Sequence, residues 1–213
     1  MAFAAHFPYL TNSIVLLAPV GILRYIPDDY KSFLFRYASF IPGKYVQRAI
    51  GKLLGVALPG TGENLGAGPK DVDLIPEAVE ETVLVGQKKM SVKEIVQWQF
   101  DHHNGFCHSF VDTIRNGPIM NQHSDWRKVC DLIKDKKHPL DRLHPESKLR
   151  NSKLFLIFGD SDDIVVANEV LMDLDRMLGG REHLEHKIVP GGHGFPLSSC
   201  DEVVGHICEF WHI

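Results

Sequence analysis

The sequence predicts an α/β protein with three parallel strands, flanking helices and a mostly helical insertion. Continuous apolar runs occupy residues 13–21 and 153–160, and a weaker run occupies 185–192. Runs of this length that end in Pro or Gly are typical of strands in a parallel sheet, and we expect 13–21 to be buried on both faces. Amphipathic segments follow the second and third runs, and this alternation of strand and helix is the doubly wound α/β pattern.

Two helices are expected near the C-terminus, over about 163–180 and 200–211. Gly179 and Gly180 supply the stop signal for the first. Residues 2–7 are alanine-rich and end at a proline, which predicts the tail of a helix. The apolar positions at helical spacing are Val166, Val170, Leu171, Leu174, Met177 and Leu178, then Val203, Val204, Ile207, Cys208 and Trp211.

Residues 25–145 show no comparable strand pattern, and we expect a helical cap there, between the first core segment (1–24) and the C-terminal core (146–213). The run at 58–70 is rich in glycine and predicts a loop. Helical stretches are expected at 30–40, 45–55, 91–103, 110–117 and 125–133. The cap's aromatic residues predict its own core more readily than an acyl pocket: Tyr25, Tyr30, Phe33, Phe35, Tyr37, Phe40 and Tyr45.

The composition limits the class of protein. The 213 residues are 44% hydrophobic, enough for one sizeable core, and the net charge of −4 offers no basic face for nucleic acid. The four cysteines show no C-x-x-C spacing, which favours reduced thiols and an intracellular, cytoplasmic location. Without a basic face, we expect a small-molecule or protein partner rather than nucleic acid. No apolar run reaches transmembrane length, so we expect no transmembrane helix.

Two polar groups follow adjacent predicted strands. The acidic cluster at 159–163 follows the second strand, and His193 follows the third. In doubly wound sheets, loops at the carboxyl ends of the strands converge on one crevice. An Asp there can fix the tautomer of a His and stabilise its imidazolium form.

The C-terminal third resembles the end of an α/β-hydrolase of the AB hydrolase-1 type. Gly159 to Val165 matches a G-x-x-D-x-[IVL]-V pattern, and Gly191 to Phe195 matches G-G-H-x-[FL]. The resemblance implies that Asp162 is the catalytic acid and His193 the base. Asp160 and Asp163 compete for the acid role, and Asp162 could instead cap a helix beginning near Ile164.

The resemblance extends over most of the chain. Residues 2–21 resemble the segment from the family's nucleophile helix into its sixth strand, and 105–119 with 123–129 resemble the helix and linker that leave the cap. The nucleophile motif G-x-S-x-G and an oxyanion loop are absent from the sequence. We therefore expect a truncated chain that begins inside the nucleophile helix, is inactive alone and exposes an aggregation-prone sheet edge at 13–20.

The resemblance implies a serine hydrolase of ester, thioester or amide bonds that acts on a small apolar or acyl substrate and needs no cofactor. Relatives with an aspartate nucleophile, such as epoxide hydrolases and dehalogenases, share this end of the fold. The competing class is a non-catalytic protein that binds a protein partner through the open sheet edge.

A second cluster of candidate groups lies in the cap. His102, His103, Cys107 and His108 could hold zinc, but their spacing fits neither H-E-x-x-H nor paired C-x-x-C, so we expect a solvated helix end and no metal. Ser109 or Cys107 as a substitute nucleophile lacks the activating turn.

Overall fold

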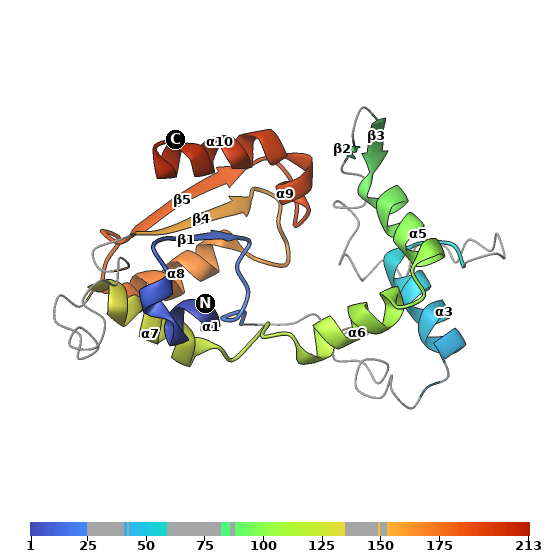
Figure 1. Ribbon diagram of the computed structural model, residues 1–213, viewed down its shortest axis with the longest axis horizontal. Helices are drawn as coiled ribbons and strands as arrows, with labels where there is room; N and C mark the ends of the chain where they lie inside the picture. Colours follow the sequence, from blue (N-terminus) through green and yellow to red (C-terminus); the bar gives the residue numbers. More distant parts are fainter. Residues whose placement is uncertain (25–40, 42, 59–81, 86–87, 135–148, 150–152) are drawn as a thin grey trace. The chain divides into compact units, whose positions relative to one another are not determined.

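The computed structural model divides the chain into two compact units, each described here in turn (Figure 1). The first comprises Met1–Arg24 with Pro118–Ile213, and the second comprises Tyr25–Gly117. No helix among the described residues is long and apolar enough to cross a membrane. The structure describes residues 1–24, 41, 43–58, 82–85, 88–134, 149 and 153–213.

The first unit is built on a three-stranded parallel sheet, which confirms the predicted α/β class. Its order is β1 (Ile14–Leu17), β4 (Leu154–Gly159) and β5 (Leu184–Val189). Its helical elements are α1 (Ala2–His6), η1 (Pro8–Leu10), α7 (His123–Lys134), α8 (Ala167–Leu178), α9 (Phe195–Ser198) and α10 (Cys200–Trp211).

Strand β4 forms the centre of the core, because all six of its residues are buried. Phe155 of β4 stacks on Phe210 of α10 with ring centroids 4.7 Å apart. Side chains alternate between the faces of a strand, so Leu154, Leu156 and Phe158 face the opposite side. Figure 1 shows α10 on one side of the sheet and α7 and α8 on the other. The fully apolar run at 153–160 reflects this two-sided burial.

Strand β1 is less buried than the sequence predicts. Ile14 is buried, Val15 and Leu16 are half-buried, and Leu17 is 38% exposed. Within the described part of the chain β1 pairs with β4 alone, so it is an edge strand. The expectation of burial on both faces was therefore wrong for this strand, and an open edge at this end of the sheet is present in the described residues.

The two C-terminal helices form where expected, with corrections at their margins. Helix α8 begins at Ala167, so Val166 is an exposed N-cap residue rather than part of the apolar face. Gly179 ends α8 in the left-handed conformation, with φ of 74°. On α10, Val204 and Trp211 are exposed, and the indole Nε1 of Trp211 donates a hydrogen bond to Ser13 Oγ at 3.0 Å.

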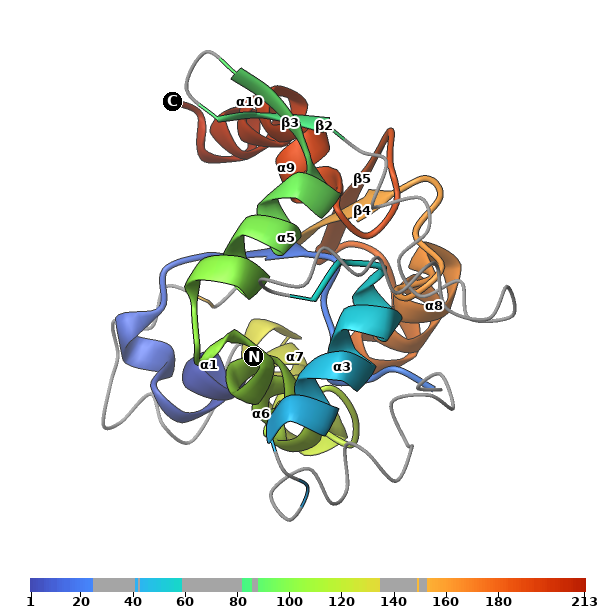
Figure 2. The same cartoon turned by 90° about the vertical axis from the view of Figure 1, so that its right-hand side faces the viewer.

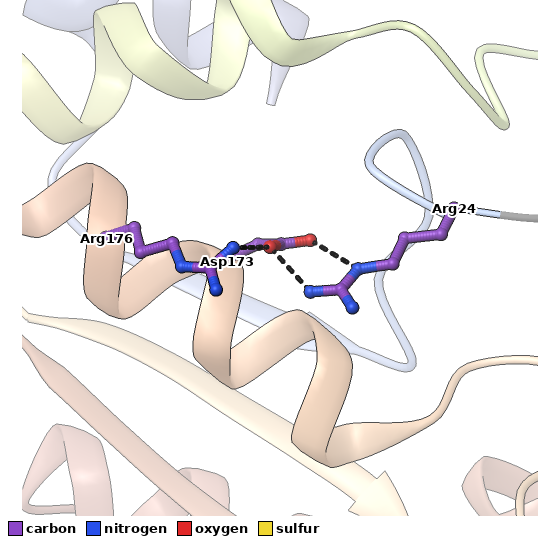
Figure 3. Close-up of polar contacts among 3 residues, drawn as sticks. All are labelled: Arg24, Asp173 and Arg176. Carbon is purple, nitrogen blue, oxygen red and sulfur yellow. Dashed lines mark hydrogen bonds and ion pairs between the residues drawn. The ribbon is translucent and has the colours of Figure 1, made fainter.

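An ion pair fastens the chain to α8 just before it leaves the first unit (Figure 3). Arg24 donates from Nε to Oδ2 of Asp173 at 3.2 Å and from Nη2 to Oδ1 at 2.8 Å. Arg176 lies farther away, with its Nη1 3.6 Å from Asp173 Oδ1. The bidentate geometry makes Arg24 the main partner of Asp173.

In the part of the second unit that the structure describes, three helices pack around a small apolar core. Its elements are α3 (Gly43–Leu54), β2 (Thr82–Val85), β3 (Lys88–Ser91), α5 (Val92–His102) and α6 (Phe106–Asn116). Figure 2 shows β3 running directly into α5. The buried residues of this core are Val46, Ile50, Leu54, Val56, Phe100 and Val111. The predicted helices at 45–55, 91–103 and 110–117 are confirmed.

The antiparallel pair β2–β3 was not expected in this unit. Thr82–Val85 has the composition of a strand, whereas Lys88–Ser91 contains two lysines and has no strand pattern of its own, so sequence reasoning missed the pair. Ser91 then begins α5 with a capping box, in which its side chain accepts from Glu94 N and Glu94 accepts from Ser91 N.

One predicted core aromatic of the cap is not buried. Tyr45 is 57% exposed, with Lys44 Nζ 5.1 Å from its ring centroid. Tyr45 lies on the outer side of the amphipathic helix α3, whereas Val46 and Ile50 face the core. The other six aromatic residues named for the cap, the stretch at 30–40 and nearly all of the expected loop at 58–70 lie outside the described residues.

Candidate active site

The candidate site is formed by two loops that leave the carboxyl ends of neighbouring strands. Gly159 ends β4 and pairs with Val189, which ends β5. The segment after β4 carries Asp160 and Asp162, and the segment after β5 carries His193. Adjacent parallel strands thus bring together residues that are 31 positions apart in sequence.

Asp162 and His193 are hydrogen-bonded to each other. Nδ1 of His193 lies 3.0 Å from Oδ2 of Asp162. The Asp162 side chain is fully buried, whereas 40% of the His193 side chain is exposed. A buried carboxylate beside an accessible imidazole is the arrangement that an acid and base pair requires, because the carboxylate orients the ring and the ring still reaches a reactant.

The second oxygen of Asp162 is held by its own loop. Oδ1 accepts backbone hydrogen bonds from Ile164 N and Val165 N, each at 2.9 Å. This is an Asx-type turn rather than a helix cap, because α8 begins only at Ala167. The expectation that Asp162 could cap a helix beginning near Ile164 was therefore wrong. One oxygen of Asp162 shapes the turn, and the other faces the imidazole.

The two competing aspartates are placed differently. Oδ1 of Asp160 accepts from Gly191 N at 3.0 Å and from Ser161 Oγ at 3.1 Å. Asp163 is exposed. Among the described residues, Asp162 is the carboxylate that contacts His193.

Glycines allow the two loops to approach each other closely. A Cβ on Gly159 would lie 2.3 Å from Gly191 O and 2.6 Å from Gly192 O, so only glycine fits there. Gly191 has φ of 122°, which disfavours any residue with a Cβ. Sequence reasoning assigned these glycines to a motif but missed the contact between them.

The far nitrogen of His193 is open. No hydrogen bond to Nε2 is present in the part of the chain that the structure describes. If Nδ1 carries the proton toward Asp162, Nε2 presents its lone pair and can accept a proton from a nucleophile. Phe195, which is fully buried two residues later, anchors this loop in the core.

Two of the serines near His193, Ser161 and Ser199, are hydrogen-bonded to other residues. Ser161 Oγ donates to Asp160, and Ser199 Oγ donates to the carbonyl of Pro190 at 2.7 Å. Ser198 Oγ is buried and has no hydrogen-bond partner among the described residues. None of these hydroxyls is hydrogen-bonded to His193 in the structure.

The histidine and cysteine cluster of the second unit does not form a ligand set. His102, His103 and His108 are exposed, and His102 stacks on Trp98 with ring centroids 5.0 Å apart. No group of three potential metal ligands gathers among the described residues. Burial raises the pKa of the Cys107 thiol to about 11, so this thiol is a poor nucleophile near neutral pH. Ser109 is an exposed residue of α6.

Comparisons with known proteins found similarity at the level of structure. No family model matches the chain. No curated protein matches it either. Among solved structures, it is similar to 2-hydroxy-6-oxo-6-phenylhexa-2,4-dienoate hydrolase from Rhodococcus sp. strain RHA1, with a TM-score of 0.49 and 13% identity over 99% of this chain and 58% of that one.

A second similar structure is a carboxylesterase from the ammonia-oxidizing thaumarchaeon Nitrososphaera gargenis, with a TM-score of 0.46 and 16% identity. The match covers 99% of this chain and 59% of that one. The chain thus spans less than two thirds of the length of both structures.

Proposed function

We propose that this chain carries the acid and the base of an α/β-hydrolase, with Asp162 as the acid and His193 as the base. The observation that carries the proposal is the 3.0 Å contact between His193 Nδ1 and the fully buried carboxylate of Asp162. The motifs around both residues, G-x-x-D and G-G-H, agree with this assignment.

Each residue has one task in the proposed reaction. His193 Nε2 takes the proton of a serine hydroxyl as that oxygen attacks the carbonyl carbon of an ester, thioester or amide. The same nitrogen then gives the proton to the leaving group. Asp162 accepts the Nδ1 proton throughout, which orients the ring and stabilises the imidazolium that forms.

The serine and the oxyanion donors are proposed to come from sequence outside these 213 residues. Two observations support this part of the proposal. The sequence has no G-x-S-x-G, and no described hydroxyl is hydrogen-bonded to His193. A His–Asp pair without a nucleophile cannot form an acyl intermediate, so the chain by itself is expected to be inactive.

A serine-directed fluorophosphonate probe tests this function. The chain of residues 1–213 should not be labelled, whereas a version extended by its in-frame upstream coding sequence should be labelled on a serine before Met1. His193→Gln in the extended version should abolish labelling, and Asp163→Ala should leave it unchanged. Labelling of the short chain, or labelling that survives His193→Gln, contradicts the proposal.

One observation favours a second candidate, a non-catalytic protein that binds a partner. Leu17 and Val20 are exposed at and just beyond the edge strand β1, and such edges pair readily with other chains. A stop codon directly upstream of Met1 in the coding sequence would favour this candidate. An extended chain that ends its upstream strand in an aspartate instead of a serine would indicate the epoxide hydrolase or dehalogenase type.

A further inference from the structure

We propose that Asp160 is a positioning residue for His193, because its carboxylate holds the backbone of the histidine loop in the register that brings the imidazole to Asp162. Oδ1 of Asp160 accepts the N–H of Gly191 at 3.0 Å, two residues before His193. This inference rests on the proposed function and names a further residue of the same site.

The register of the sheet alone would not bring His193 to Asp162. In the strands, Gly159 pairs with Val189, which follows it by 30 positions (189 − 159). In the loops the separation is one residue larger, because Asp160–Gly191 and Asp162–His193 are each 31 positions apart. Continued without change, the strand register would place Gly192 opposite Asp162. The loop therefore gains one residue, Pro190, between the strand and the contact with Asp160.

The Asp160 contact is where the new register is fixed. Asp160 N still follows the sheet and donates to Val189 O at 2.9 Å, whereas its side chain reaches past Pro190 to Gly191 N. Asp160 therefore contacts both residues that flank the inserted proline. Because Asp162 and His193 follow at the same spacing, the register set at Asp160 is carried to the catalytic pair.

Other hydrogen bonds also hold the histidine loop, but none of those described here involves the N–H of Gly191. Ser161 N donates to Gly191 O at 3.2 Å, and Ser199 Oγ donates to Pro190 O. These bonds keep the loop attached to the unit when the Asp160 side chain is removed. Asp160 is exposed, so water can solvate Gly191 N in such a variant, and the fold should persist while the loop loses its fixed register.

The experiment uses the whole chain labelled with 15N-histidine and reads the tautomer of His193 from two-bond 15N–1H NMR spectra at alkaline pH. His193→Gln assigns the signal. Asp160→Ala should change the single Nδ1–H pattern of His193 into a mixture of tautomers. Asp160→Asn is the matched control, because its amide oxygen can still accept the N–H of Gly191, and it should preserve the single pattern.

The outcomes separate this inference from the proposed function. If the unmodified chain shows His193 in the Nε2–H form, the acid–base assignment fails. If that chain shows the Nδ1–H form and Asp160→Ala leaves it unchanged, only the positioning role fails. Loss of folded amide dispersion in Asp160→Ala would also overturn the positioning role, because Asp160 would then act on the stability of the whole unit.

Discussion

Asp162 connects two loops through its two carboxylate oxygens, of which one contacts His193 and the other contacts its own loop. Oδ2 lies 3.0 Å from His193 Nδ1, and Oδ1 accepts the backbone N–H groups of Ile164 and Val165. The hydrogen bonds within its own turn therefore hold the carboxylate in place independently of its contact with the imidazole. This arrangement gives Asp162 a structural effect and a chemical effect that separate substitutions can distinguish.

Asp162→Ala should lower the free energy of unfolding of the first unit by about 2 kcal/mol, because the N–H of Val165 is buried and loses its acceptor. Asp162→Asn should cost less, because its amide oxygen can still accept from Ile164 N and Val165 N. Asp163→Ala, at the exposed neighbour, is the control and should change stability by roughly 0.5 kcal/mol or less. Urea unfolding followed by circular dichroism measures all three. Equal effects of Asp162→Ala and Asp163→Ala would contradict this role of Oδ1.

Gly159→Ala should destabilise the first unit, because the new Cβ would meet two backbone carbonyl oxygens that cannot move aside independently of the histidine loop. We expect a loss of roughly 3 kcal/mol, at the upper end of overpacking effects. Gly205 of α10 provides the matched control, since nothing lies within 4 Å of the Cβ added there.

Gly205→Ala in the helix interior should instead stabilise the unit by about 0.5 to 1 kcal/mol. Thermal unfolding of the two variants beside the unmodified chain measures both effects. A tolerated Gly159→Ala would mean that the two loops are not packed as closely as the structure has them.

Arg24→Ala should lower the unfolding temperature more than Arg176→Ala. Arg24 makes two hydrogen bonds to Asp173, whereas Arg176 reaches the same carboxylate only at 3.6 Å and is more exposed. The difference between the variants should shrink at 1 M NaCl, because salt screens exposed charges. Arg24→Lys should rescue only part of the loss, since lysine cannot form the bidentate pair. Equal unfolding temperatures for both alanine variants would contradict the dominant role of Arg24.

Stability should fall as pH rises from about 9 toward 11, in part because of two thiols, the half-buried Cys107 and the buried Cys130. Burial raises the pKa of Cys107 and of Cys130 from 9.0 to about 11. Unfolded thiols therefore ionise first, so above pH 9 the unfolded state releases protons that the folded state retains, and folding weakens. Below pH 9 this contribution is fully present.

The urea midpoint of the unmodified chain at pH 8 and pH 10 measures this dependence. Cys107→Ala with Cys130→Ala should flatten it, whereas Cys200→Ala, at an exposed thiol, should leave it as it was. An unchanged difference between the urea midpoints at pH 8 and pH 10 in the double variant would show that these thiols do not cause the pH dependence.

The core of the first unit could be predicted from the sequence, because the apolar composition of β4 matches its burial. Its six residues are all apolar, and the strand is buried on both faces, so the pattern and the environment agree. For β1 a similar apolar run was misleading, because exposure depends on whether a neighbouring strand is present and not on the run itself. Among the described residues β1 pairs with β4 alone, and Leu17 at its end is exposed.

The site shows the same limit at finer scale. The motifs named Asp162 and His193, and the structure brings these two side chains together. The contact between Asp160 and Gly191, and the close approach at Gly159, depend on how two loops distant in sequence meet. No local pattern encodes the one-residue change of register between strands and loops, so these residues emerge only from the fold.

The tautomer of His193 in the unmodified chain tests the central claim most directly. Two-bond 15N–1H NMR at alkaline pH should show the proton on Nδ1, facing Asp162, with Nε2 unprotonated. In Asp162→Asn, where an amide N–H can face Nδ1, the proton should move to Nε2. An Nε2–H form in the unmodified chain, or a tautomer that does not respond to Asp162→Asn, would contradict the assignment of Asp162 and His193 as an acid–base pair.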